Sequence, residues 1–279
     1  MELHHLAIVS SVDREVLPLA EIARVAAAIQ KQVLRDFAPI WGVEATVDLF
    51  AALDEVPDGW WPLIVHDEGG SSPGSHIASH GRPIAYVAHG PTWSLTASHE
   101  ALEMLSDPTG MKLVAGDSPT ARPDRVEFLV EICDPCQDAA NAYLIDGVLV
   151  SDFYTPAYFE PLFSTGGTYS FRGRLREPRE VLPGGYLTWR SATTGNWSQL
   201  RHEGGALALT DLGPSPAGAT GLRAWVDERA GGKRHLSHVA VDHEQRVAAR
   251  AWAARDHERA AARARTVRAD AAGAVLSRW

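Results

Sequence analysis

Residues 92–108 read TWSLTASHEALEMLSDP, and this stretch decides how the rest of the chain is interpreted. Its spaced leucines supply a packing face, and Pro108 disfavours α geometry in the residue before it, so the sequence predicts a helix over 92–107. His99, Glu103 and Asp107 then lie roughly on one face, and the stretch contains no Lys or Arg to neutralise the carboxylates. The pattern indicates either a metal site or a solvated acidic helix.

The spacing of the acidic residues favours a bound cation. His99 and Glu103 are four residues apart and can contact one ion from the same side, while Glu100 can reach a water on that ion. Glu103 and Asp107 are like charges near the helix C-terminus, where the macrodipole disfavours anions, and each effect costs from a few tenths to about 1 kcal/mol. A cation would reverse both penalties. Chance occurrence of His-Glu-x-x-Glu in an acidic helix is an equally good interpretation. The flanking segments are therefore needed to choose between a metal site and a solvated helix.

The segments before this helix predict a mixture of helix and strands. Residues 19–37 place apolar side chains at three- and four-residue steps, which is typical of an amphipathic helix that ends before Pro39. Residues 42–50 and 60–67 are short β-prone runs, and residues 74–90 read as a further strand reached through a Gly/Ser loop. The predicted order is helix, strand, strand, loop, strand, helix.

The remainder of the chain predicts a β-rich part and a helical tail, so the expected fold class is α+β. Residues 125–210 alternate apolar and polar positions between turns, and Asp146-Gly147 is a strong hairpin signal. The Ala/Arg-rich residues 235–279 predict a helix, which is either solvated with one packed seam, as is commoner for such a composition, or binds a partner, nucleic acid or a second copy of the chain. The expected division is an α/β domain at 1–120, a β-rich part completing the site at 121–211, a linker at 212–221 and a helical tail at 222–279.

Composition excludes several classes of protein. The chain has 279 residues with 45% hydrophobic composition, enough for a packed core, and no apolar run approaches the roughly 20 residues of a membrane span. Its net charge of -9 argues against nucleic-acid binding, and no phosphate-binding loop of the GxxxxGK type is present. Because no export signal is recognisable, we expect a soluble cytoplasmic protein. The cysteines of CDPC, Cys133 and Cys136, are expected to be reduced structural thiols.

The predicted order of elements followed by His-Glu-x-x-Glu resembles the zincin metallopeptidases over roughly residues 1–110. In that superfamily a helix and a twisted sheet precede the active-site helix, which carries HExxH, and the strand just before that helix forms the edge of the substrate cleft. A group of bacterial zincin-like proteins is similar in the longer stretches QKQVLRDFAPIWG, ASHEALEMLSDP, VEICDPC and IDGVLVSDFYTPAYF. The resemblance implies a zincin-like domain with zinc held by His99 and Glu103, with Glu100 as general base, and with a peptide or protein substrate aligned on the strand at 82–89.

The third ligand is open between two carboxylates. Asp107 is the nearer in sequence, but eight residues along a helix is about 12 Å of rise, so it reaches the ion only if the chain bends near Pro108. Glu131 lies 28 residues after Glu103 and in that separation resembles the distal Glu ligand of the gluzincin branch, with Asp134 as an outer residue that orients a ligand. We favour Glu131 slightly and keep Asp107 as a ligand or an orienting residue.

The charge of this ligand set bears on the reaction. One His and two carboxylates would leave a divalent ion formally neutral, so its water should be less acidified than at a site with two His. This favours a slower hydrolase, or Mn2+ or Ca2+ in place of Zn2+. Candidates for stabilising an oxyanion are His80, His89 and Tyr154. The histidines near predicted strand ends, His76 among them, are interpreted as ordinary hydrogen-bonded residues.

Two functions fit these observations. The first is a metallohydrolase, most simply a peptidase, in which the ion activates water and Glu100 accepts its proton. The second is a non-catalytic protein that keeps the scaffold, holds a structural ion and recruits a partner through its helical tail. An open coordination position beside Glu100 would favour the first function, and a closed site would favour the second.

Overall fold

The computed structural model describes residues 3–67, 74–120, 124–159, 168–216 and 222–230. Helices and strands both contribute, so the α+β class predicted from the sequence is confirmed. The helical elements are α1 (Leu19–Gln32), the π-helical turn η1 (Val33–Phe37), α2 (Ala38–Trp41), η2 (Leu53–Glu55), α3 (Trp93–Ser106), η3 (Asp134–Cys136), η4 (Pro156–Tyr158) and α4 (Leu222–Ala230). The strands are β1 (Leu3–Ser10), β2 (Glu44–Leu49), β3 (Trp61–His66), β4 (Gly74–Ser79), β5 (Arg82–Ala88), β6 (Leu113–Asp117), β7 (Arg125–Leu129), β8 (Tyr143–Ile145), β9 (Val148–Val150), β10 (Tyr186–Ser191), β11 (Asn196–Glu203) and β12 (Ala206–Pro214).

The first sheet has the strand order β2-β1-β3-β5-β4, in which β4 alone runs antiparallel to its neighbour. Side chains of alternate positions leave opposite faces of a strand, so the sheet contributes to two cores. On one face Leu63 and Val87 belong to the main core together with Ile29 of α1 and Leu102 of α3. On the other face Ile64 belongs to a smaller core. Burial on both faces explains why the inner strands β1, β3 and β5 contain runs of consecutive buried residues.

The first helical segment continues past the position where the sequence predicted its end. We expected it to stop before Pro39, because proline lacks an N–H and its ring crowds the carbonyl four residues earlier. Pro39 instead lies at the start of α2, and the helix ends at Gly42, which has a φ of 70°. The π-helical turn accounts for the difference, since the Ala38 N–H donates to the Val33 carbonyl and the wider turn shifts the backbone out of α register just before Pro39.

Two strands were absent from the sequence prediction. The first is β1, which lies between β2 and β3 and buries the apolar run 6–9. The second is β4, because residues 74–90 form a hairpin whose turn places His80 at φ 49° and Gly81 at φ 76°. β5 is therefore an inner strand, and the prediction that the strand at 82–89 forms the edge of a cleft is wrong. Among the described strands, the sheet ends at β4 on this side.

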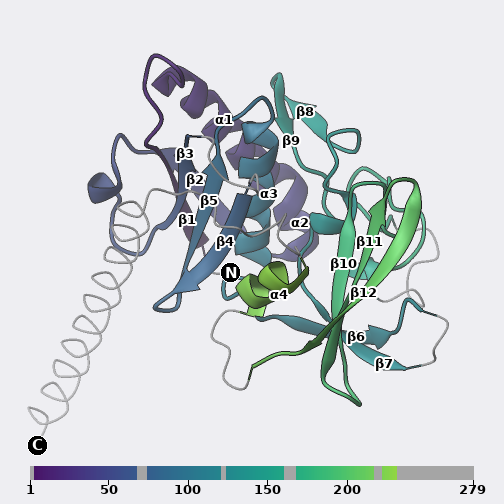
Figure 1. Cartoon of the computed structure of the whole chain (residues 1–279). Helices are drawn as coiled ribbons and strands as arrows, with labels where there is room; N and C mark the ends of the chain where they lie inside the picture. Colours follow the sequence, from purple (N-terminus) through teal and green to yellow (C-terminus); the bar gives the residue numbers. More distant parts are fainter. Residues whose placement is uncertain (1–2, 68–73, 121–123, 160–167, 217–221, 231–279) are drawn as a thin grey trace, which may run out of the picture.

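The second sheet has the order β12-β11-β10-β7-β6, with every neighbouring pair antiparallel. Figure 1 shows it on one side of the molecule, in teal and green, with the purple and blue first sheet on the other. Phe128 of β7 and Trp189 of β10 share the main core with α3, so the two sheets belong to one folded unit. β6 begins at Leu113, ahead of the expected boundary at 121. The predicted hairpin turn is confirmed, since Asp146 and Gly147 join β8 to β9 at φ 49° and 81°.

The end of the described chain returns to the second sheet. β12 continues to Pro214, so the first residues of the predicted linker 212–221 belong to a strand. Leu222 and Val226 of α4 share a core with Trp197 and Leu212, and the start of the predicted tail is therefore part of the fold. The helix predicted at 235–279 lies outside the described residues. No described helix is long and apolar enough to cross a membrane.

Candidate metal centre

α3 carries the His-Glu-x-x-Glu motif in the interior of the protein. The helix runs from Trp93 to Ser106, as predicted. His99, Glu100 and Glu103 are 8%, 3% and 0% exposed. A solvated acidic helix would expose its carboxylates, so the interpretation of this stretch as such a helix is wrong. Buried carboxylates are costly unless charged or hydrogen-bonding partners surround them.

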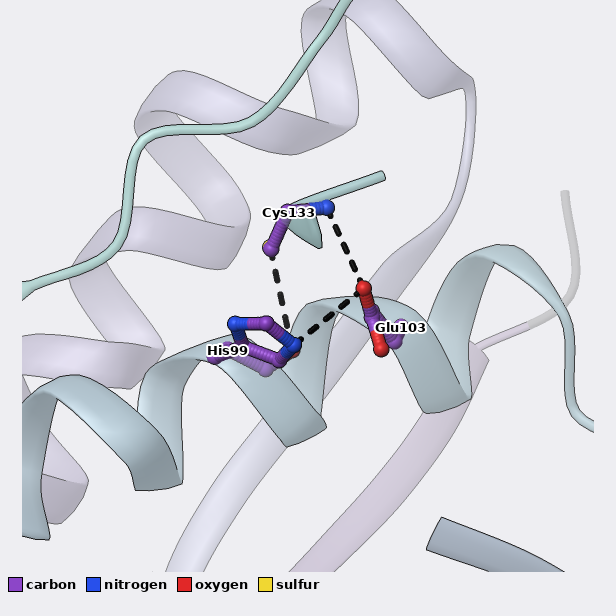
Figure 2. A group of neighbouring side chains, drawn as sticks. All are labelled: His99, Glu103 and Cys133. Carbon is purple, nitrogen blue, oxygen red and sulfur yellow. Dashed lines mark hydrogen bonds and ion pairs between the residues drawn. The ribbon is translucent and has the colours of Figure 1, made fainter. Parts of the chain in front are cut away.

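His99 is the centre of the first set of contacts. Its Nε2 lies 3.3 Å from Glu103 Oε1 and 3.3 Å from Asp134 Oδ1. The backbone N–H of Cys133 donates to the same Glu103 oxygen at 3.2 Å, as Figure 2 shows. Zinc bonds of about 2.0–2.1 Å at tetrahedral angles place neighbouring ligand atoms about 3.3–3.4 Å apart. Both separations from His99 Nε2 therefore match those in a tetrahedral zinc site.

The other two predicted carboxylates reach this cluster from the segment after β7. Asp134 was expected to orient a ligand, and the structure places it directly against His99 at the start of η3, where it can either orient His99 or contact the ion itself. Glu131 joins the cluster from the chain between β7 and η3. One oxygen each of Glu103, Glu131 and Asp134 lie within 4.8 Å of one another. The β-rich part thus brings two carboxylates to the motif on α3.

Arg223, which the sequence interpretation missed, places its guanidinium among these carboxylates. Its Nη1 contacts Glu131 Oε2 and lies 3.3 Å from Glu103 Oε2 and 3.5 Å from Asp134 Oδ2. Its Nη2 donates to the Tyr186 hydroxyl at 3.2 Å. Arg223 is 6% exposed, so its charge is buried together with three acidic residues. The C-terminal part of the sequence is rich in arginine, and nothing in its pattern singles out this one.

These contacts shift the pKa values of the cluster in opposite directions. Burial is the largest cause for both Asp134 and Glu131, and together with the Glu103 charge it outweighs Arg223 and raises the pKa of each carboxyl. Burial also acts to raise the pKa of Glu103, but the charges of His99 and Arg223 outweigh it and hold that pKa below its usual value. Burial acts to lower the pKa of His99, but Glu103 and Asp134 hold it well above its usual value. Glu103 is therefore the most acidic member of the cluster.

His76 of β4 contacts the predicted general base. Its Nδ1 lies 3.2 Å from Glu100 Oε2 and 3.8 Å from Glu103 Oε2, and His76 is 1% exposed. The Nδ1–Oε2 separation is a hydrogen-bonding distance, in which Nδ1 donates in the tautomer that carries its proton there. The Nε2 of His76 is buried and has no hydrogen-bond partner among the described residues. The interpretation of His76 as an ordinary histidine is corrected, and it was missed because β4 was not predicted as a separate strand.

Gly74 explains how β4 approaches α3 so closely. A Cβ atom at this position would lie 2.5 Å from Thr96 Cγ2 and 2.6 Å from Glu100 Oε1. Real Cβ atoms essentially never come so near to other heavy atoms, so the strand packs against Glu100 only with glycine here. The conformation of Glu100 is thus fixed by His76 on one oxygen and by the backbone of Gly74 beside the other.

Asp107 lies outside the cluster, which corrects its predicted role as a ligand or orienting residue. Its Oδ1 accepts hydrogen bonds from the Thr109 N–H at 3.2 Å and the Thr109 hydroxyl at 3.0 Å. Its Oδ2 accepts from the Lys112 N–H at 2.6 Å. The carboxylate therefore closes the turn that follows α3. The chain does bend at this point, since Asp107 has a φ of -140°, but the bend directs the side chain into the turn.

The three residues considered for an oxyanion lie in different places. His80 is in the β4–β5 turn. His89 lines a cavity of about 800 Å³ together with Asp67 and Trp93, near the start of α3, and none of the clustered carboxylates lines it. Tyr154 is fully buried, stacks on Tyr158 at 4.6 Å, and its hydroxyl has no hydrogen-bond partner among the described residues. Burial is the largest cause of its raised pKa.

The donor atoms fit a divalent metal ion. All four carboxylate oxygens of Asp134 and Glu131 are buried without a hydrogen-bond partner within the described ranges, so their only partners are the ionic contacts above. An imidazole nitrogen with carboxylate oxygens suits zinc and also manganese. Cys133 is an alternative third ligand, because one atom each of His99, Glu103 and Cys133 lie within 4.8 Å of one another. Its Sγ faces the His99 carbonyl oxygen at 3.8 Å, and burial raises the pKa of its thiol, both of which favour Asp134 as the ligand.

Comparisons of the chain with family models, curated proteins and solved structures found no match. The function is therefore argued from the geometry of the cluster.

Proposed function

We propose that the protein is a metal-dependent hydrolase, most simply a peptidase, whose divalent ion is held by His99 Nε2, Glu103 Oε1 and Asp134 Oδ1. The observation that carries the proposal is the pair of 3.3 Å separations around His99 Nε2, on a buried helix that also carries Glu100. Each of the two separations matches the distance between two ligand atoms of a tetrahedral zinc site, and a catalytic site of that kind keeps its fourth position for a reactant. Zinc is the first choice of ion, and manganese or calcium is the alternative for an oxygen-rich site.

The residues of the chain divide the chemistry among them. A bound divalent ion supplies Lewis acidity, which polarises a carbonyl group and lowers the pKa of water. Glu100 adjoins the ligands on the same helix and accepts the proton of the attacking water. His76 contacts Oε2 of Glu100, and we assign the role of the base to Oε1, which lies beside Gly74. The neighbouring carboxylates favour a proton on His99, and His99 would have to lose it to hold the ion, because a ligating imidazole must be neutral.

A peptide substrate is supported by the position of β4. This strand ends the sheet among the described strands, and its first residue, Gly74, lies beside Glu100. An extended peptide can add to such an edge through main-chain hydrogen bonds, which would bring its carbonyl groups to the base. Peptide hydrolysis is therefore the simplest reaction for this geometry.

A non-catalytic protein with a structural ion is the second candidate, and one observation favours it. Arg223 closes the side of the cluster that faces α4, and every acidic member is at most 4% exposed. A structural metal site is closed, whereas a catalytic site keeps an open position. The two candidates therefore differ in whether a reactant can reach Glu100.

Elemental analysis and peptide cleavage with three variants test the proposal. We expect His99→Ala to lose the metal, and Glu100→Gln to keep the metal but lose hydrolysis of a broad peptide library. His5→Ala is the matched control, because this histidine bonds to Thr46 on another part of the sheet, and it should keep both properties. Wild-type protein without metal would contradict both candidates. Metal in wild type without cleavage of any peptide would favour the structural ion.

The cobalt-substituted protein distinguishes the two choices of third ligand. Thiolate ligation gives Co2+ an intense near-ultraviolet charge-transfer band, which oxygen ligation lacks. We expect this band to be absent, and the spectrum to be the same in Cys133→Ser. A band that disappears in Cys133→Ser would replace Asp134 by Cys133 as the ligand.

A further inference from the structure

We propose that Arg223 is a positioning residue for the metal site, because its guanidinium holds the outer oxygens of Glu103 and Asp134 and so keeps their inner oxygens directed at His99. The inference rests on the proposed function and adds a residue from α4 to it. It makes the start of the C-terminal region part of the site.

The contacts divide the two oxygens of each carboxylate between two partners. Glu103 directs Oε1 to His99 Nε2 and Oε2 to Arg223 Nη1, both at 3.3 Å. Asp134 does the same, with Oδ1 at 3.3 Å from His99 and Oδ2 at 3.5 Å from Arg223. An ion beside His99 and the guanidinium therefore use opposite oxygens of the same two carboxylates. Both can be bound at once, so Arg223 does not compete with the ion.

The charges of the cluster support this arrangement. Glu103, Glu131 and Asp134 together carry three negative charges when ionised, and Arg223 carries one positive charge. A divalent ion brings the sum over these four residues to zero, and an ionised Glu100 beside them adds one negative charge. Without Arg223 the same buried site would hold one further uncompensated negative charge, which is costly in an interior with little water.

Glu131 is the residue that secures the guanidinium. It makes the shortest of the three carboxylate contacts to Arg223, and its Oε2 is the atom involved. Tyr186 accepts from Nη2 at 3.2 Å and fixes the plane of the guanidinium from the other side. Glu131, predicted from the sequence as the third ligand, is thereby assigned to Arg223 and not to the ion. A lysine has no planar fork and can reproduce the charge of Arg223 but not its set of contacts.

Metal affinity of the full-length protein tests the inference. We compare wild type, Arg223→Lys and the double variant Arg223→Met with Glu131→Gln, which removes the pair with the shortest contact and keeps the net charge of the site unchanged. Affinities for Zn2+ and Co2+ are measured by competition with a chromophoric chelator. Arg190→Met is the matched control, because Arg190 is paired with Glu127 on the second sheet at 3.0 Å.

The double variant should bind both metals about 10–100-fold more weakly than wild type, as is usual when a residue that orients a ligand is lost. The metal affinity of Arg223→Lys should lie between those of wild type and the double variant, and the affinity of Arg190→Met should equal that of wild type. The visible spectrum of bound Co2+ should change in the double variant, since the carboxylates lose their fixed orientation. A purely structural role would lower only the melting temperature.

The outcomes separate this inference from the proposed function. No metal binding by wild type would overturn both. Metal binding by wild type with equal or tighter binding by the double variant would overturn the role of Arg223 alone. Should the double variant fail to fold, Arg223→Lys decides, because wild-type affinity and an unchanged Co2+ spectrum in that variant would also overturn it.

Discussion

Asp36 and Asp134 are both buried aspartates, yet their surroundings differ. Asp36, in the π-helical turn after α1, accepts hydrogen bonds from Arg35 Nε at 2.5 Å on Oδ1, and from Arg35 Nη2 at 2.7 Å and the Tyr143 hydroxyl at 2.8 Å on Oδ2. Neither oxygen of Asp134 has a hydrogen-bond partner among the described residues. A carboxylate that the chain satisfies with its own donors is structural. Asp134 instead makes ionic contacts with His99 Nε2 at 3.3 Å and Arg223 Nη1 at 3.5 Å, and we assign it to the ion.

Replacing each aspartate by asparagine gives the largest expected difference between the two sites. Asp134→Asn keeps the shape of the side chain and removes the charge that faces His99, so we expect metal affinity to fall by more than about 100-fold. Asp36→Asn should leave the affinity unchanged. Competition with a chromophoric chelator measures both variants. Similar losses in the two would erase the distinction between a structural and a ligating aspartate.

Metal saturation should stabilise the protein only where the Asp134 site is intact. A ligand that binds the folded state alone at 100 times its Kd adds about 2.7 kcal/mol to the free energy of unfolding. We expect this increment in wild type and in Asp36→Asn, and we expect it to vanish in Asp134→Asn and on addition of a chelator. Urea unfolding with and without Zn2+ measures it. An increment of the same size in Asp134→Asn would place the bound metal elsewhere.

The stability of the metal-free protein should show the reverse order. Asp36→Asn weakens charge-assisted hydrogen bonds to Arg35 and Tyr143, so we expect the free energy of unfolding to fall by about 2 kcal/mol. Asp134→Asn should leave it unchanged or raise it, because burial already raises the pKa of Asp134 and disfavours its charged form. Urea unfolding in the presence of a chelator measures the free energy of unfolding of both variants. A larger loss in Asp134→Asn would mean that its ionic contacts are structural.

The pH dependence of metal binding should report the proton on His99. Because the pKa of His99 is raised in the folded protein, that proton stabilises the metal-free protein at low pH, and the stabilisation is lost as pH rises through the folded-state pKa. Metal must displace the same proton, so affinity should rise by up to about tenfold per pH unit below that pKa. Titrations at several pH values check the slope. The same slope is expected for Asp36→Asn, and a flat profile would contradict the role of His99.

Tyr186→Phe should have the smallest effect. It removes the hydroxyl that accepts from Arg223 Nη2, a hydrogen bond worth about 1 kcal/mol, and it leaves every carboxylate in place. We expect metal affinity to fall by less than about tenfold, with no change in the hydrogen bonds around Asp36. A loss as large as that of Asp134→Asn would show that Tyr186 does more than fix the guanidinium.

The sequence predicted the local features of the site better than the long-range ones. The helix that carries His99, Glu100 and Glu103 follows from apolar spacing and from Pro108, which act within a few residues. The prediction favoured Glu131 over Asp107 on separation alone, and the structure brings Glu131 into the cluster. His76 and Arg223 reach the site through a hairpin and through packing of α4, and no short-range pattern encodes either. The division of oxygens between His99 and Arg223 depends on side-chain geometry, which spacing in sequence does not determine.

The short helix α4 also affects how fast the site can bind and release a metal ion. The donors are almost fully buried, and Arg223 seals one side of them from a helix of nine residues at the end of the described chain. A short helix held by a few apolar contacts, such as those of Leu222 and Val226, opens more readily than the core sheets. Entry and loss of an ion would then be timed by the local opening of α4, and resistance to a chelator would measure a rate and not only an affinity.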